Sequence, residues 1–600
     1  MTGRRMHPQE RIDDYVGRGW WTDETVQQLF ADRVAQRGDS LAVTDPPNKA
    51  DLVDCEPLRL NWNEVDARVE ELAAVLLARG VGEGDVVALQ LPNIVELAVA
   101  YLAAWRVRAI VSPLPVQYRR HEIVELGSIG RISAFLTSDR IGRRAAAAEV
   151  VALRDDVPSL RTVFHIGPTD VPGSTRLDGA VAGLSDGQRA DVSAYADAHP
   201  VDPNDCITIC WTSGTEATPK GVPRAHYEWL VMSQDTVYSP ALTEASRILN
   251  PFPMVNMAGI SGMFLPWLRV GCVLVQHHPF DLPVFLAQVR DEGITYTVAP
   301  PALLALLLQR EELLTGADIS TLTSIGSGSA PLQEWMVRGW HERHGISIIN
   351  YFGSNEGISL MTDVALMTDP AQRARWFPRY GGGRRWSFPA ARHTTVRLVD
   401  PDSGRDIEEA GVPGELRLKG PSLFAGYLDA DRLPDPFDED GFLRTGDVFV
   451  IDGPNRDFLR YVDRAKDLII RGGMNIAPAE LETMIAGHPD VAEVAVVGYP
   501  DDLLGEKVCA VVVTRPGRCI TLQEVVAHLV AQEIATFKLP ERLEKRDALP
   551  RNPVGKILRR ELRDGLRSDP RGRVGPASGP SSLRAGVVID EHSSAEHDAG

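Results

Sequence analysis

Apolar and polar positions follow two different patterns along the chain. Up to about residue 390, short apolar runs alternate with segments that have the apolar spacing of helices. Residues 63–79 predict a helix that ends before Gly80, which is typical of the position after a helix. Residues 85–91 predict a strand, 94–105 a helix and 109–114 a second strand. Such alternation predicts a parallel sheet that helices cover.

The second pattern begins at about residue 390. Residues 393–399 and 414–420 alternate between apolar and polar side chains and are divided by Gly, Pro and Asp, so they predict antiparallel strands of a small barrel or sheet. A polar segment at 463–467 precedes a helix near 478–485 and strands that begin at 492 and 508. This unit of about a hundred residues is large enough for a separate α+β domain.

These patterns predict an α/β protein. Because 600 residues exceed what one core normally serves, we expect at least two domains. We expect an N-terminal extension on the surface at 1–20 and a large domain of parallel, helix-covered sheets with a barrel-like subdomain at 21–462. A smaller α+β domain is expected at 463–565. Residues 566–600 are rich in Gly, Pro, Ser, Asp and His, which predicts a disordered tail.

Composition narrows the function classes. Acidic side chains number 82 and basic ones 63, for a formal charge of −19, so we expect no nucleic-acid binding, which needs clustered Lys and Arg. The six cysteines form no Cys-x-x-Cys pair, which favours free thiols in a reducing cytoplasm. We find no signal peptide and no apolar run of membrane-spanning length, so we expect a cytoplasmic protein without integral membrane association.

A loop after the apolar run 207–211 has the chemistry of a triphosphate cradle. Its residues supply hydroxyl groups, backbone freedom and one positive charge: Thr212, Ser213, Gly214, Thr215 and Lys220. The loop is not a Walker A motif, because no Gly-Lys-[Ser/Thr] follows at the required spacing. Glu216 and Ala217 lie in the same loop, and a carboxylate there repels phosphate unless it caps N–H groups or faces a cation.

Four further motifs follow in order. They are Phe352-Gly-Ser-Asn-Glu356, Arg444-Thr-Gly-Asp447, Asp463-Arg-Ala-Lys-Asp467 and Asn552-Pro-Val-Gly-Lys556. With the phosphate loop, they resemble the core motifs of the acyl-adenylate-forming (ANL) superfamily, which includes acyl-CoA synthetases, aryl-acid adenylating enzymes, peptide-synthetase adenylation domains and luciferases. The resemblance covers roughly residues 20–565, and five motifs in sequence make it strongly specific.

The resemblance implies that the enzyme joins a carboxylate to the α-phosphate of ATP, expels pyrophosphate and passes the acyl group to a thiol. Lys556 would bridge the carboxylate and the α-phosphate, and Glu356 with Thr212 would hold Mg²⁺. Lys466 occupies the hinge position of a mobile C-terminal domain, and Gly473 would leave room for a pantetheine arm.

The resemblance also implies a nucleotide site. Gly328 would allow close backbone approach to adenine, Phe352 would stack on it and Asn350 would receive its amino group. Asp447 would accept both ribose hydroxyls, with Arg464 near the ribose or phosphate. The other residues assigned to this site are Ser329, Ala330, Pro331, Tyr351, Gly353 and Asn355, the last in place of the usual threonine.

The acid pocket is expected between residues 253–259 and the Glu356 loop. Its assigned residues are Asn256, Met257, Gly259 and Ser327. The region is mostly apolar and has no cation for a second carboxylate, which favours an apolar medium-chain, alicyclic or aryl monocarboxylic acid. Asn256 stands where many relatives have His or an aromatic residue, and Met257 where the aryl-acid branch has Asn.

Three functions remain open. The favoured one is an AMP-forming acid–CoA ligase that uses ATP, Mg²⁺ and CoA. The second is a stand-alone acyl- or aryl-AMP ligase that loads the phosphopantetheine of a carrier protein in trans, in siderophore, peptide or polyketide biosynthesis. The third is a non-catalytic nucleotide-binding homologue, which the departures Glu216, Ala217, Asn355 and Asn256 motivate and the retained Lys556 opposes. A monomer and a homodimer are both compatible with the sequence.

Overall fold

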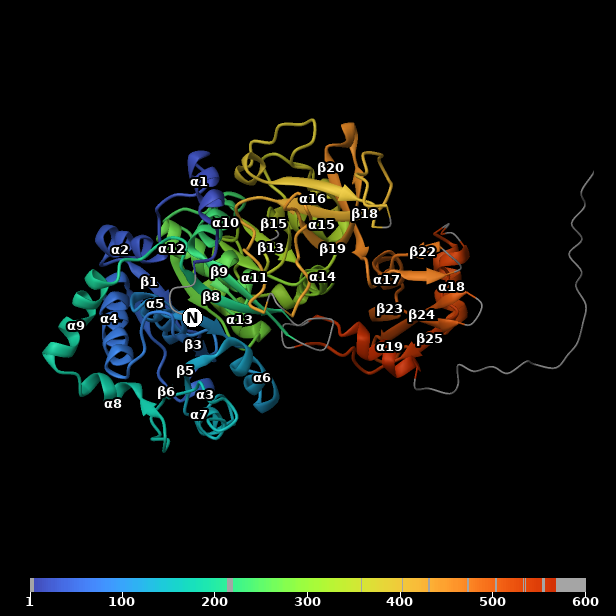
Figure 1. Ribbon diagram of the computed structural model, residues 1–600. Coiled ribbons are helices and arrows are strands. Elements are labelled where there is room, and N and C mark those ends of the chain that lie inside the picture. Colours follow the sequence, from blue (N-terminus) through green and yellow to red (C-terminus); the bar gives the residue numbers. More distant parts are fainter. Residues whose placement is uncertain are drawn as a thin grey trace, which may run out of the picture.

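The protein consists of a large N-terminal domain and a smaller C-terminal domain, as the sequence predicts (Figure 1). The computed structural model describes residues 5–212, 219–357, 359–401, 403–429, 432–471, 474–501, 504–532, 534, 536–552 and 556–567. Several predicted positions lie outside these residues: Ser213, Gly214, Thr215, Glu216, Ala217, Gly473 and the tail from 568 onward. None of the described helices is long and apolar enough to cross a membrane.

The first sheet of the large domain has eight strands, in the order β15-β14-β13-β12-β10-β11-β1-β2. The inner strands are parallel, and β15 and β2 are antiparallel edge strands. The strands are β1 (Leu41–Thr44), β2 (Arg59–Asn61), β10 (Arg247–Asn250), β11 (Val273–Gln276), β12 (Tyr296–Val298), β13 (Ser324–Gly328), β14 (Ser347–Gly353) and β15 (Ser359–Met361).

The second sheet has seven strands in the order β7-β6-β5-β3-β4-β8-β9. Only β9 is antiparallel, because it pairs with β8 in a hairpin where the sequence predicted only a loop. The strands are β3 (Val86–Leu89), β4 (Ile110–Pro113), β5 (Ile132–Ser138), β6 (Thr162–Ile166), β7 (Thr175–Arg176), β8 (Cys206–Thr212) and β9 (Lys220–Ala225).

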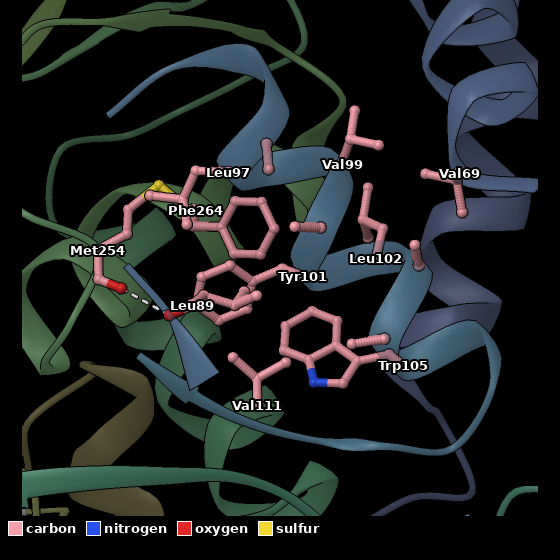
Figure 2. Close-up of a cluster of buried hydrophobic side chains, with 14 of the residues drawn as sticks. Val69, Leu89, Leu97, Val99, Tyr101, Leu102, Trp105, Val111, Met254 and Phe264 are labelled. Atoms are coloured by element: carbon pink, nitrogen blue, oxygen red, sulfur yellow. Dashed lines mark hydrogen bonds between the residues drawn. The ribbon is translucent and has the colours of Figure 1, made fainter. Parts of the chain in front are cut away.

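A buried cluster of apolar side chains joins the two sheets (Figure 2). Helix α5 (Val95–Arg106) lies against α4 (Trp62–Ala78) and directs Tyr101 and Trp105 toward β3 and β4. The Tyr101 hydroxyl donates to the main-chain oxygen of Met254, 2.5 Å away. This contact anchors the start of the segment in which we expect the acid pocket.

The third sheet is antiparallel, as predicted, in the order β16-β20-β19-β18-β17. Its core is rich in aromatic residues and also includes Val222 of β9, so the sheet packs on the large domain. The strands are β16 (Phe377–Pro378), β17 (Thr395–Val399), β18 (Gly414–Lys419), β19 (Leu443–Asp452) and β20 (Phe458–Arg464).

The C-terminal domain has a sheet in the order β22-β21-β24-β23, and β25 pairs with β24. Its two apolar clusters contain only residues between 469 and 566. The elements are β21 (Ile469–Arg471), β22 (Met474–Ile476), α17 (Pro478–Ala486), β23 (Val491–Asp501), β24 (Gly505–Thr514), α18 (Leu522–Val530), β25 (Arg542–Lys545) and α19 (Arg559–Arg567). Since α19 continues to Arg567, the predicted tail is wrong at its first two residues.

The N-terminal residues differ from expectation. The sequence predicts a polar extension on the surface, but residues 9–17 form α1 (Gln9–Gly17), and His7 and Tyr15 are only 4% and 6% exposed. Trp21 stacks on Tyr227 of α10 (His226–Tyr238), with ring centroids 4.3 Å apart. Burial of the large apolar surfaces of these aromatic side chains explains the position of the segment. This gain exceeds the preference of the intervening polar side chains for solvent.

Candidate functional site

Two of the predicted motifs lie side by side at the carboxyl ends of β13 and β14, where open α/β sheets bind ligands. Gly328 pairs with Tyr351 across the strands. A side-chain carbon on Gly328 would lie 2.3 Å from the Tyr351 oxygen, so glycine is required there. Ser329, Ala330 and Pro331 follow on the exposed edge of the sheet.

Phe352 is held by aromatic neighbours from the antiparallel sheet. Its ring centroid lies 5.0 Å from Phe449, 5.8 Å from Tyr461 and 6.1 Å from Phe377. Such a cluster fixes the plane of the half-buried ring at the boundary between the two sheets. The neighbouring Gly353 is exposed at the end of β14.

Asn350 has a structural task as well as its predicted nucleotide contact. It is buried, and its Nδ2 donates to the main-chain oxygens of Arg373 and Ala374, at 3.1 and 3.3 Å. These bonds attach β14 to α16 (Pro370–Arg375). Because Nδ2 makes these two bonds, the carboxamide oxygen is the atom that could accept a hydrogen bond from the adenine amino group.

Asn355 connects three segments of the site. Its Oδ1 accepts from the Met257 amide at 2.9 Å, and its Nδ2 donates to the Trp211 oxygen at 3.2 Å. Its own main-chain oxygen accepts from Arg224 at 3.0 Å. Both ends of the carboxamide are thus engaged within the protein, so this side chain positions its loop, a role that the sequence did not predict.

Glu356 lies in the turn after β14, next to the base of the phosphate loop. Tyr427 donates its hydroxyl hydrogen to Glu356 Oε1 at 3.0 Å, and Lys220 Nζ lies 5.1 Å from the centre of the Tyr427 ring. Thr212 and Lys220 are paired residues at the end of the β8–β9 hairpin where the chain passes from one strand to the next. A carboxylate, a hydroxyl and an ammonium group therefore gather at one place.

This donor set fits a magnesium ion that arrives with nucleotide. Among the described residues, no group of three or more His, Cys, Asp and Glu side chains is placed to hold a metal by itself. Mg²⁺ in nucleotide sites typically takes one or two carboxylates and completes its shell with phosphate and water oxygens. Glu356 with the Thr212 hydroxyl matches that requirement.

Asp447 is a deeply buried charged group of the site, at 2% exposure. It pairs with Arg464 across β19 and β20, and Arg464 Nε lies 2.8 Å from Asp447 Oδ1. Burial raises the pKa of Asp447 to about 6, and the charge of Glu356 adds to the shift, while Arg464 and Lys556 oppose it. Residues from both domains therefore act electrostatically on this carboxylate.

Lys466 lies between a residue that bonds to the large domain and one that bonds to the small domain. The Ala465 amide donates to the Gly446 oxygen at 2.9 Å. Asp467 accepts from Arg563 of α19 at 2.6 Å. Such an arrangement is what a hinge at Lys466 requires, because the two anchors lie on opposite sides of it.

Lys556 is the predicted residue that belongs to the small domain. Its turn is closed by two bonds with Asn552, whose Oδ1 accepts from the Lys556 amide at 2.8 Å and whose amide donates to the Lys556 oxygen at 2.9 Å. The side chain is exposed, and partial desolvation with repulsion from Arg464 lowers its pKa, while Asp447 opposes the shift. The ammonium group of Lys556 therefore interacts electrostatically with Arg464 and Asp447.

The residues assigned to the acid pocket form a compact turn. Asn256 caps α11 (Met257–Gly259), and its Oδ1 accepts from the amides of Ala258 and Gly259. A side-chain carbon on Gly259 would lie 2.3 Å from the Pro253 oxygen. Ser327 is buried and donates to the Ala299 oxygen at 2.8 Å, so it contributes a wall to the pocket and no free hydroxyl.

Two residues of the site were missed by the sequence analysis. Tyr427 lies in a stretch with no motif, so nothing in the sequence connects it with Glu356. Arg224 did leave a signal, since it is a charged residue in the otherwise buried strand β9. Such a residue normally needs partners, and these are the Asn355 and Ser422 oxygens.

The sequence matches the models of a known protein family and several known proteins. The model of the AMP-binding enzyme family matches residues 30–428, and that of the AMP-binding enzyme C-terminal domain matches residues 480–556. An indoleacetate–CoA ligase from Aromatoleum aromaticum is 30% identical over 506 residues, which cover 84% of this chain and 92% of the relative. Triostin synthetase I from Streptomyces triostinicus is 30% identical over 569 residues, which cover 93% and 97%.

A solved structure shows the same likeness in three dimensions. The crystal structure of ATP-bound MatB from Rhodopseudomonas palustris aligns with a TM-score of 0.75 at 27% sequence identity. The alignment covers 91% of this chain and 99% of that chain, so it includes parts of both domains.

Proposed function

Since the chain belongs to the AMP-binding enzyme family, it is an AMP-forming acid–thiol ligase, and we propose that it joins an apolar monocarboxylic acid to CoA. The observation that carries this proposal is the meeting of charges from both domains at Asp447. Arg464 Nε, at the end of β20, lies 2.8 Å from Asp447 Oδ1, and the charge of Lys556 from the small domain also acts on this carboxylate, which is the expected ribose ligand.

In the first half-reaction, a carboxylate oxygen of the acid forms a bond to the α-phosphorus of ATP, and the bond to pyrophosphate breaks. Lys556 neutralises charge that builds between the two anions. Asp447 orients the ribose, Phe352 packs on adenine and Lys220 attracts the phosphates. When bound, Mg²⁺ supplies charge neutralisation at the phosphates, and Glu356 with Thr212 would hold it.

In the second half-reaction, the thiol of CoA attacks the acyl carbon and AMP leaves. Rotation about Lys466 removes Lys556 from the site and brings the segment around residue 473 toward it. Asp467 and its partner Arg563 move with the small domain, whereas Ala465 stays attached to the large one. The two steps therefore use two faces of one small domain.

The proposed acid class rests on the apolar character of the pocket turn. Met254 and Ile260 are fully buried beside it, and no Lys, Arg or His lies between residues 253 and 260. A second carboxylate on the substrate would have no partner in this turn. The similarity to an indoleacetate–CoA ligase, whose name describes a monocarboxylic acid with an apolar ring, supports the same class.

A screen of acid-dependent ATP–pyrophosphate exchange tests the proposal. We expect exchange with one or more acids of an aliphatic, alicyclic and aryl monocarboxylate panel, and little with dicarboxylates. Each acid that is exchanged is then offered with CoA and with phosphopantetheinylated carrier proteins, and thioester is measured by mass spectrometry. Thioester on a carrier protein alone supports the second candidate. No exchange with any acid supports the non-catalytic homologue.

The raised pKa of Asp447 predicts a pH dependence of ATP binding. The ionised carboxylate is the form that accepts both ribose hydroxyls, so we expect ATP to bind most tightly more than a pH unit above 6 and this binding to be lost as the pH falls through about 6. We expect the KM for ATP, from exchange rates between pH 5 and 8, to rise about tenfold from pH 7.5 to 5. The same shift favours the folded state below the unfolded pKa, and this contribution is lost as the pH rises through about 6.

Asp447→Asn should bind ATP weakly at every pH and show no such dependence. Asp452→Asn is the matched control, because Asp452 lies on the same strand and its pKa is lowered, so it stays ionised throughout this range. A KM for ATP that stays constant down to pH 5 in the unaltered protein would contradict the role of Asp447.

A further inference from the structure

We propose that the N-terminal segment, residues 5–21, positions the loop that carries Glu356. The segment lies outside the part of the chain that the family model matches, which begins at residue 30. It reaches the Glu356 loop through two chains of contacts, one from His7 and one from Trp21, and Arg224 takes part in both. The inference rests on the proposed function only for the meaning of Glu356; the contacts themselves stand apart from it.

The first chain of contacts starts at His7. Asn204 holds the main chain of this residue at both ends: its Oδ1 accepts from the His7 amide at 2.9 Å, and its Nδ2 donates to the His7 oxygen at 3.0 Å. The ring points inward, and His7 Nε2 lies 3.0 Å from Glu228 Oε1, with both side chains fully buried. The other oxygen of Glu228 accepts from the Ala225 amide at 2.9 Å.

Arg224 continues this chain to the site. Glu228 accepts from the amide of Ala225, the residue that directly follows Arg224, and the charges of His7 and Arg224 lower the pKa of this carboxylate against the effect of burial. The fully buried guanidinium of Arg224 lies over the Trp229 ring at 4.3 Å and donates to the Asn355 oxygen at 3.0 Å. Asn355 directly precedes Glu356.

The second chain of contacts starts at Trp21. Its indole N–H donates to the Pro421 oxygen at 3.0 Å. The next residue, Ser422, accepts from Arg224 at 2.7 Å through its main-chain oxygen and donates its hydroxyl to Gly357 at 3.1 Å. Ser422 also approaches Gly357 so closely that a side-chain carbon there would lie 2.0 Å from the Ser422 oxygen. Both chains therefore meet on the two residues that flank Glu356.

This arrangement differs from ordinary packing in its use of buried charge. The buried guanidinium of Arg224 donates to the Asn355 and Ser422 oxygens, and such bonds are favourable only while donor and acceptor keep their relative positions. Removal of one partner leaves the others without that geometry, whereas an apolar contact tolerates small shifts. We therefore expect the segment to determine the position of the Glu356 loop in addition to stabilising the folded protein.

Two substitutions of His7 test the inference. His7→Met has a similar length but leaves Glu228 without its partner, whereas His7→Gln retains an N–H donor at the same reach. We expect His7→Met to lower kcat of acid-dependent ATP–pyrophosphate exchange about tenfold, because small displacements of a site are costly. The KM for ATP should stay within about twofold of the original value, and His7→Gln should retain at least about a third of kcat.

Hydrogen–deuterium exchange provides a readout without catalysis. In His7→Met, we expect faster exchange at residues 354–357 and 421–428 and unchanged exchange in β10 and β12. Val192→Ala is the control for stability, since Val192 is buried on α9 (Asp186–Ala198), away from the site (Figure 1). It should lower the melting temperature without lowering kcat.

Each outcome decides one question. Unchanged kcat in His7→Met, or faster exchange throughout the large domain, overturns the positioning role. If the unaltered protein shows no pyrophosphate exchange with any acid, the proposed function fails, but the deuterium measurement still tests whether the segment holds the Glu356 loop. Faster exchange confined to the two segments supports the inference in either case.

Discussion

Lys556→Ala is expected to abolish acyl-adenylate formation in a protein that still folds and binds ATP. The side chain comes from a turn that Asn552 closes, and its charge acts on Asp447 in the large domain. Since it is the cation of the small domain proposed to meet the reacting groups, its loss should slow ATP–pyrophosphate exchange about 10²–10³-fold, or about 3–4 kcal/mol. Exchange rates and ATP titration by calorimetry measure the two effects separately.

Lys545→Ala is the matched control for Lys556→Ala. Lys545 is an exposed lysine at the end of β25 in the same domain. Its replacement by alanine therefore removes one positive charge without altering the site. Its exchange rate should equal that of the unaltered protein. Normal exchange in Lys556→Ala would disprove the proposed role, and equal loss in both variants would attribute the effect to the net charge of the domain.

Lys466→Pro is expected to spare adenylation and to slow thioester formation about a hundredfold, because it restricts the backbone about which the small domain turns. Lys556 interacts electrostatically with Asp447, as the proposed adenylation step requires, so we expect a fixed hinge to preserve that step. Single-turnover measurements of adenylate formation and of transfer to CoA resolve the two half-reactions.

Lys466→Ala separates the hinge from the charge. The pKa of Lys466 is lowered to about 8 by partial desolvation and by repulsion from Arg464, so its charge also affects the site. Alanine removes this charge and leaves the backbone free to rotate, and it should retain most of the thioester rate. Equal slowing of both half-reactions in Lys466→Pro would count against a hinge at this position.

The fold was predictable from sequence because local patterns determine it. The helix predicted at 63–79 is α4 (Trp62–Ala78), and the strand predicted at 85–91 contains β3 (Val86–Leu89). These elements follow from apolar spacing within one short window. The N-terminal segment was misjudged because the burial of His7 and Tyr15 depends on residues about 200 positions away, such as Glu228 and Tyr227.

The site was predictable in its residue types and less so in their partners. The motifs identified Glu356 and Asp447, and the structure places Asp447 within electrostatic reach of both Glu356 and Lys556, although the catalytic roles of these residues stay predictions. The bonds of Asn350 and Asn355 within the protein were not predictable, because a carboxamide has the same composition whether it meets ligand or main chain. Only the spatial neighbours decide that question.

The separate cores of the two domains affect how the specificity for the acid and the specificity for the thiol can evolve. Every apolar side chain in the two C-terminal clusters comes from residues 469–566, so packing there is independent of the large domain. Under the proposed function, we expect substitutions of the small domain that alter the choice of thiol to leave the packing of the acid pocket unchanged, and we expect the reverse as well. Selection can therefore combine new acids with new acceptors as two independent traits.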